Sequence, residues 1–123
     1  TEASSASVGE VISSDVYFAG GGAGGHDPRG TSKVAKDGGD GGGANSQAGT
    51  ASGLAGTANT GGGGSGPGSV INGTGGAGGS GVVILKYPPY VVLSIGAGLT
   101  STTIESSGYK KTIFTAGTGT VSV

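Results

Sequence analysis

The sequence predicts a mostly β protein with essentially no α-helix: packed polyglycine-II-type helices framed by strands, followed by a small antiparallel β-sheet or sandwich. Three observations support this fold class. Between Gly20 and Gly81, 26 of the 62 residues are glycine. After Gly81 the chain changes to short runs rich in Val, Ile, Thr and Tyr, separated by turns that contain glycine, which is typical of antiparallel β structure. No stretch shows the periodicity of an amphipathic helix.

Residues 1–19 form the first of three predicted regions, a β or extended segment. Its clearest strand signal is Asp15–Ala19, where Val16, Tyr17 and Phe18 follow one another before the first glycine run. β-branched and aromatic residues favour strands. We therefore expect a short strand that leads into the glycine-rich region.

Residues 20–87 form the second region, a glycine-rich domain with a closing strand. Its part up to Gly81 cannot build an ordinary hydrophobic core, because its only large apolar residues are Val34, Leu54, Val70 and Ile71. Ordering each glycine also costs roughly 0.5–1 kcal/mol more than ordering alanine. Some interaction other than side-chain burial must hold this stretch together.

Steps of three residues in the glycine-rich domain suggest how it is held. A polyglycine-II-type helix has three residues per turn and no internal hydrogen bonds, so its N–H and C=O groups must find partners on neighbouring helices. The spacing predicts one edge that carries Thr74, Ala77 and Ser80, with glycine on the other two edges. We expect several short helices of this kind, joined by turns.

The closing strand and the third region, residues 88–123, read as β structure. Val82–Tyr87 is apolar on both faces for four residues and is therefore predicted to be covered on both sides. Pro88 and Pro89 must interrupt the hydrogen-bond ladder. Further strands are predicted over Tyr90–Ile95, Leu99–Glu105, Tyr109–Thr115 and Thr120–Val123.

Catalytic and cofactor motifs are weak in this chain, and the sequence predicts no enzyme, no cofactor and no bound metal. Gly20, Gly22 and Gly25 match the dinucleotide-binding fingerprint, but the residues that follow cannot begin the helix that it needs. The single histidine and the absence of cysteine leave no sensible zinc ligand set or catalytic triad. Asp37 and Asp40 could offer oxygen ligands to Ca²⁺, but they are more readily explained as solvent-exposed residues on the edges of glycine helices.

Charge and hydropathy exclude two classes of partner. The formal net charge is −1, and no basic patch points to nucleic acid. No apolar run approaches the roughly 20 residues of a membrane span.

Two kinds of surface site stay possible. Loops between the glycine helices could present His26, Asp27, Arg29 and Asn45 to a ligand on a cell surface. Asn72 opens an Asn-Gly-Thr glycosylation sequon.

Two parts of the chain, roughly residues 15–87 and 90–123, resemble a known family. Ala19–Gly25, Thr60–Gly66 and Gly75–Pro88 resemble the glycine-rich domain of bacteriophage tail-fibre and adhesin proteins, in which a Gly-Gly-Ser-Gly-hydrophobic-Tyr-Pro strand closes the glycine region. Ser107–Val123 is similar to the β module that flanks such domains. The resemblance implies an extracellular or virion fibre protein, and the lack of aromatic residues between Gly20 and Gly81 favours a shaft or connector over a receptor-binding tip.

The sequence thus favours a non-enzymatic, self-associating structural segment of an extracellular fibre, with a phage tail fibre as the first candidate. The exposed edges of Val82–Tyr87 and Tyr109–Thr115 are the expected places for pairing between subunits. Three alternatives stay open: an adhesin module that binds a host receptor or glycan, the subunit of a filament made by a cell, and an ice-binding protein.

Overall fold

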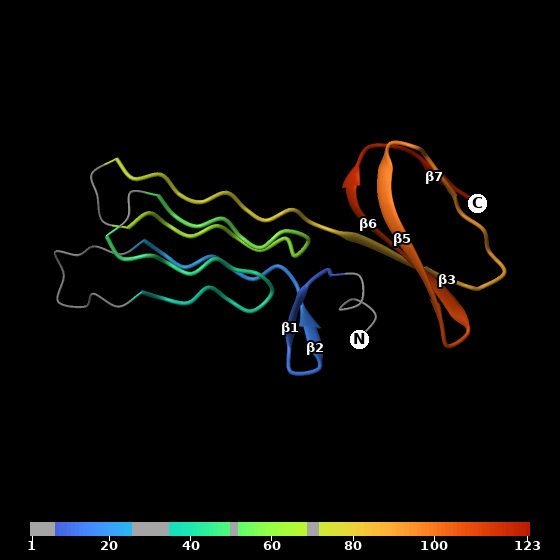
Figure 1. The fold of residues 1–123 in the computed structure, drawn as a ribbon, viewed down its shortest axis with the longest axis horizontal. Helices are drawn as coiled ribbons and strands as arrows, with labels where there is room; N and C mark the ends of the chain where they lie inside the picture. Colours follow the sequence, from blue (N-terminus) through green and yellow to red (C-terminus); the bar gives the residue numbers. More distant parts are fainter. Residues whose placement is uncertain (1–6, 26–34, 50–51, 69–71) are drawn as a thin grey trace. The chain divides into compact units, whose positions relative to one another are not determined.

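The structure is a computed structural model, and it describes residues 7–25, 35–49, 52–68 and 72–123. Every regular element in these ranges is a β-strand, and none is a helix (Figure 1). The prediction of a mostly β fold without α-helix is confirmed for this part of the chain. The chain divides into two compact units, one that ends at Gly81 and one that spans Val82–Val123. We call them the glycine unit and the sheet unit.

The glycine unit begins with a β-hairpin. Strands β1 (Glu10–Ile12) and β2 (Asp15–Tyr17) pair antiparallel, with Val11 opposite Val16. The strand predicted at Asp15–Ala19 is therefore present, although it is shorter. Its partner was not predicted, although Val11 and Ile12, together with Val16 and Tyr17, flank a short polar run, which is a hairpin signal.

After the hairpin, the glycine unit consists of six extended segments that lie side by side among the described residues (Figure 1). We number them in chain order as segment 1 (19–25), segment 2 (35–40), segment 3 (41–47), segment 4 (52–58), segment 5 (61–68) and segment 6 (73–81). Odd-numbered segments run in one direction and even-numbered segments in the other, as the hydrogen bonds between them require. Few apolar side chains are buried in the described part of the unit, and they are small. They belong to Val8, which precedes the hairpin in the sequence, and to Ala23 and Ala44 within the segments.

The sheet unit contains two antiparallel sheets. Strand β6 (Tyr109–Gly117) lies between β3 (Val83–Tyr87) and β5 (Leu99–Ser106), and β4 (Ser94–Ile95) pairs with β7 (Val121–Ser122). Ser107 and Gly108 both have positive φ, 50° and 83°, as the two-residue turn between β5 and β6 requires. The core of the unit is the middle of β6, where Thr112, Ile113 and Phe114 are buried.

Three expectations about the strands are wrong. The closing strand is not covered on both faces: as an edge strand, β3 leaves Val83, Ile84 and Leu85 exposed by 59, 40 and 37%. Tyr109–Thr115 is not an edge, because it lies within β6, which pairs on both sides. Within Tyr90–Ile95 only the last two residues form a strand, because the chain turns where the Val91 N–H donates to the Pro88 carbonyl oxygen at 3.1 Å.

Candidate interaction surfaces

Backbone hydrogen bonds between the glycine segments recur at steps of three residues. In segment 1 the N–H groups of Gly20 and Ala23 donate to segment 3, and in segment 4 those of Gly53 and Gly56 donate to segment 6. The donor–acceptor pairs are Gly20–Gly41, Ala23–Ala44, Gly53–Thr74 and Gly56–Ala77, at 2.8–3.0 Å. A three-residue repeat matches an extended chain with threefold symmetry, which presents the same side to a neighbour once per turn.

The six segments form two sets of three with the same bonding scheme. In each set the first segment donates to the third, the third donates to the second, and the second donates back to the first. The further bonds that complete the scheme are Gly43–Gly39, Ser46–Lys36 and Gly39–Gly21 in one set, and Gly76–Ser65, Gly79–Gly62 and Ser65–Leu54 in the other. Bonds from Gly63 to Gly20 and from Gly66 to Ala23 join the two sets. The backbone itself therefore supplies the cohesion that a hydrophobic core supplies elsewhere.

Close backbone approach explains why many of these positions are glycine. A Cβ atom built on Gly76 would overlap the Leu54 carbonyl oxygen, and one on Gly79 would overlap that of Thr57. At Gly75 and Gly78, in contrast, the nearest atom would be 3.7 Å away. Segment 6 thus needs glycine at Gly76 and Gly79, whereas Gly75 and Gly78 have room for a side chain.

Thr74, Ala77 and Ser80 follow one another at steps of three along segment 6, and all three residues are exposed. Two of these side chains bond to the chain itself. The Thr74 hydroxyl lies 3.2 Å from that of Ser52, and the Ser80 hydroxyl donates to Asn59 Oδ1 at 3.2 Å. The row is therefore exposed, but its hydroxyl groups already have partners.

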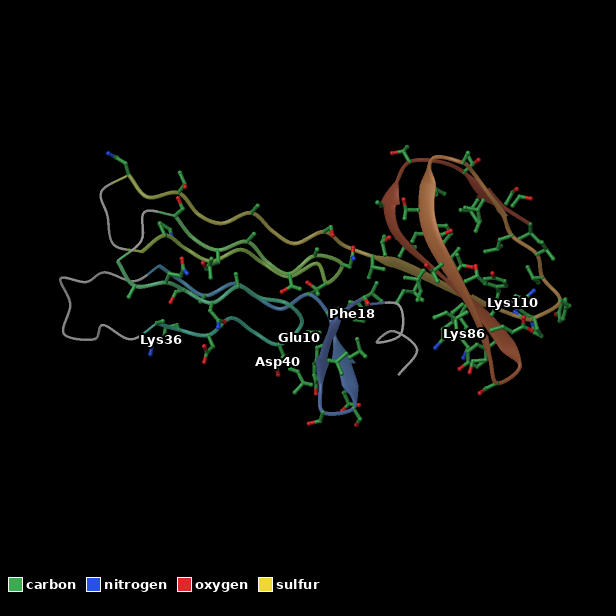
Figure 2. The ribbon with its side chains drawn as sticks, in the orientation of Figure 1. Glu10, Phe18, Lys36, Asp40, Lys86 and Lys110 are labelled. Carbon is green, nitrogen blue, oxygen red and sulfur yellow. The ribbon has the colours of Figure 1, made fainter. Side chains whose placement is uncertain are left out.

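The Glu10 carboxylate attaches the hairpin to the turn between segments 2 and 3. Its Oε2 accepts hydrogen bonds from the N–H groups of Gly41 at 2.7 Å and Gly42 at 2.8 Å. Figure 2 shows Glu10 on the hairpin beside Asp40, which precedes this turn. Gly41 and Gly42 have φ of 100° and 86°, a conformation that costs glycine little. The bonds from Gly42 and then Gly41 lower the pKa of Glu10, because they stabilise the ionised carboxylate.

Two backbone bonds strengthen the attachment of the hairpin. The Gly9 N–H donates to the Asn59 carbonyl oxygen at 3.0 Å, and the Ala19 N–H donates to that of Thr60 at 2.9 Å. Thr60 is buried, and its hydroxyl donates to the Thr57 carbonyl oxygen at 2.6 Å. The hairpin therefore contacts both tight turns at this end of the glycine unit.

Three hydroxyl groups connect all strands of the larger sheet. The Thr112 hydroxyl on β6 lies 2.7 Å from that of Tyr87 on β3 and 2.8 Å from that of Thr103 on β5. Thr112 is fully buried, so these bonds satisfy a polar group that water does not reach.

A cation–π cluster lies on the same sheet. Lys86 on β3 and Lys111 on β6 are directly opposite each other, a placement that normally destabilises a sheet. The Lys86 ammonium lies 3.8 Å and the Lys111 ammonium 5.3 Å from the centre of the Tyr109 ring. The ring face attracts both cations and offsets their repulsion.

The structure describes only part of the predicted surface-ligand set. His26, Asp27 and Arg29 lie outside the described residues. Asn45 is exposed, and its Oδ1 accepts a hydrogen bond from the Gly38 N–H at 2.8 Å, so it links segments 2 and 3. Asn72 of the sequon is also exposed and has a φ of 70°. Ligand binding by the first four residues and glycosylation of Asn72 stay predictions.

Features of chemical sites are scarce in the ranges that the structure covers. There, no three His, Asp or Glu side chains come close enough together to hold a metal ion. Over the same residues, no helix is long and apolar enough to cross a membrane. The contact of Glu10 with Gly41 and Gly42 was missed, because nothing in the sequence relates residues that are 31 and 32 positions apart.

Comparisons with known proteins gave one match. No curated protein and no solved structure matches the chain. The family model described as "Glycine-rich domain" matches residues 1–88, which include the hairpin, all six segments and the whole of β3. Because this match covers most of the 123 residues, the chain belongs to the glycine-rich domain family.

Proposed function

We propose that this protein is a non-enzymatic structural component of an extracellular fibre and that it associates with copies of itself. The observation that carries the proposal is the network of backbone hydrogen bonds at three-residue steps in the glycine unit. Such a network makes the module stiff although its side chains are small. Its resistance to local opening comes from the many bonds that must break together.

The six glycine segments are, in this proposal, polyglycine-II-type helices. The three-residue step and the close approach of Gly76 and Gly79 to neighbouring carbonyl groups support this assignment. Such helices rise about 3.1 Å per residue. Fibre diffraction or an experimental structure should show this rise with φ near −75°, except at the segment ends Ala19, Gly41, Gly42 and Gly61, where φ is positive. α-Helical or β values along the rest of segments 1–6 would refute the assignment.

The sheet unit supports self-association. Three consecutive apolar residues of β3, Val83, Ile84 and Leu85, are exposed. Contiguous exposed apolar surface marks interaction sites on soluble proteins. The resemblance to phage tail-fibre domains makes a virion fibre the first setting, with the chain as a shaft or connector, and a filament made by a cell has the same physical requirements.

Proteolysis combined with sedimentation tests the proposal. A stiff, hydrogen-bonded glycine unit should resist a protease of broad specificity, and sedimentation should show association that increases with concentration. Electron microscopy of the assembled material should then show fibres. Rapid cleavage within segments 1–6 together with a constant monomer mass would refute the proposed function.

The exposed row Thr74, Ala77 and Ser80 relates to the ice-binding alternative, since a flat row of small residues suits an ice surface. The hydroxyl groups of Thr74 and Ser80 are already bonded within the chain, which leaves fewer groups to order water. The structure thus gives this alternative less support than the fibre. Thermal hysteresis of the purified protein would distinguish them.

A further inference from the structure

Strand β3 is an unpaired edge with apolar side chains on both faces. It pairs with β6 on one side, and no other described strand pairs with it. Successive residues of a strand point to opposite faces, so Val83 and Leu85 lie on one face and Ile84 on the other. All three are exposed. A partner placed against one face would leave the other uncovered, whereas a strand added at the edge would extend both.

We propose that β3 pairs antiparallel with β3 of a second copy of this chain, through a two-fold axis at Leu85. This inference rests on the proposed self-association and identifies the surface that mediates it. The strand Val83–Tyr87 is five residues long, and Pro88, which has no N–H to donate, follows it directly. Full pairing of the strand with itself therefore has one register, in which Leu85 is opposite Leu85 of the second copy.

The charges and side chains of β3 agree with this register. Val83 lies opposite Tyr87 of the second copy, and Ile84 lies opposite Lys86, so no two lysines face each other directly. The Lys86 ammonium is also held 3.8 Å from the Tyr109 ring of its own chain. The sheets of the two copies then join into one of six strands. In this sheet the exposed Val83 and Ile84 lie opposite the buried Phe114 and Ile113 of β6. The exposed Leu85 lies opposite the buried Thr112.

The symmetry of the contact limits what it can build. A two-fold contact uses the same surface on both copies and closes after two. A fibre therefore needs a second, different contact, and the β3 pair would be its repeating dimer.

Cysteine crosslinking tests the register cleanly, because the chain contains no cysteine. In the full chain, Leu85→Cys places two thiols directly opposite each other across the axis, where Cβ atoms lie about 4.5–5.5 Å apart. Val92→Cys, at a residue 73% exposed, measures random collision. We expect mild oxidation or a short bis-maleimide to link Leu85→Cys about tenfold faster or more, because pairing raises the local thiol concentration.

Mixed variants distinguish this register from any other contact. Val83→Cys and Tyr87→Cys should link to each other when mixed, and neither should link to itself above the Val92→Cys rate. If sedimentation shows association but Leu85→Cys links no faster than Val92→Cys, the β3 contact is wrong and the proposed function stands. If Leu85→Cys links no faster and no association occurs at any concentration, both are refuted. Capture of a different protein at β3, with no Leu85 linkage, would also overturn the proposal.

Discussion

Gly76 is the position where the hydrogen-bonded packing of the glycine unit can be tested most directly. Gly76→Ala would place a methyl group on the Leu54 carbonyl oxygen of segment 4, and overpacking of this kind costs typically about 1–3 kcal/mol. Moving the segments apart also weakens the bond from the Gly76 N–H to the Ser65 carbonyl oxygen, worth about 1 kcal/mol. Alanine also lowers the conformational entropy of the unfolded chain, which stabilises the folded state by about 0.4–1 kcal/mol. We expect a net loss of about 2 kcal/mol.

Gly75→Ala is the matched control, one residue away in the same segment. The nearest atom to its new methyl group would be the Ser65 carbonyl oxygen at 3.7 Å, an ordinary contact, so the variant should gain about 0.4–1 kcal/mol. The two variants should then differ by about 3 kcal/mol, or about 10–20 °C in the melting temperature of the glycine unit.

Calorimetry measures this difference, and hydrogen exchange of peptides from residues 73–81 shows that it arises in segment 6. Gly76→Ala should exchange faster than the wild type there, and Gly75→Ala should not. Equal melting temperatures for the two alanine variants would refute the packing argument. A lower melting temperature for Gly75→Ala than for Gly76→Ala would refute it as well.

Three further predictions concern single contacts. The folded state lowers the pKa of Glu10 below its ordinary 4.5, so the contact stabilises the glycine unit above that pH, and this stability is lost as pH falls through the folded pKa. Glu10→Gln should have a lower melting temperature at pH 7, and its melting temperature should fall less than that of the wild type as the pH is lowered. Parallel curves of melting temperature against pH would contradict this. Thr112→Val removes the central hydroxyl from between Tyr87 and Thr103 and should destabilise the sheet unit by about 1–3 kcal/mol in urea unfolding, whereas the exposed control Thr102→Val should have little effect. Tyr109→Leu removes the ring that lies under Lys86 and Lys111 and should cost about 1 kcal/mol; added salt should recover part of this by screening the two lysines, and a loss that does not depend on salt would point to packing instead.

The pattern of small residues determined much of this fold without reference to tertiary structure. A stretch whose side chains are too small to form a core must be held by its backbone, and the hydrogen bonds between its segments recur at the same step of three that the sequence shows at Thr74, Ala77 and Ser80. Likewise, β-branched runs bounded by turns located β3, β5 and β6. These predictions succeeded because each depends on residues close together in the chain.

Most of the failures have a common physical cause, because they concerned a partner far away in the sequence. The turn that shortens the strand within Tyr90–Ile95 is an exception, since it joins Val91 to Pro88. Whether a strand lies at the edge or in the centre of a sheet depends on which strands pair with it. The sequence alone therefore led to two wrong predictions: that Tyr109–Thr115 is an edge strand, and that Val82–Tyr87 is covered on both faces. The Glu10 contact depends on a turn 31 residues away. Only the tertiary structure distinguishes Gly76, where a methyl group would overlap the backbone of segment 4, from Gly75, where it would make an ordinary contact. Composition determined that the chain is held by its backbone, and the packing of the segments decided which glycines are essential.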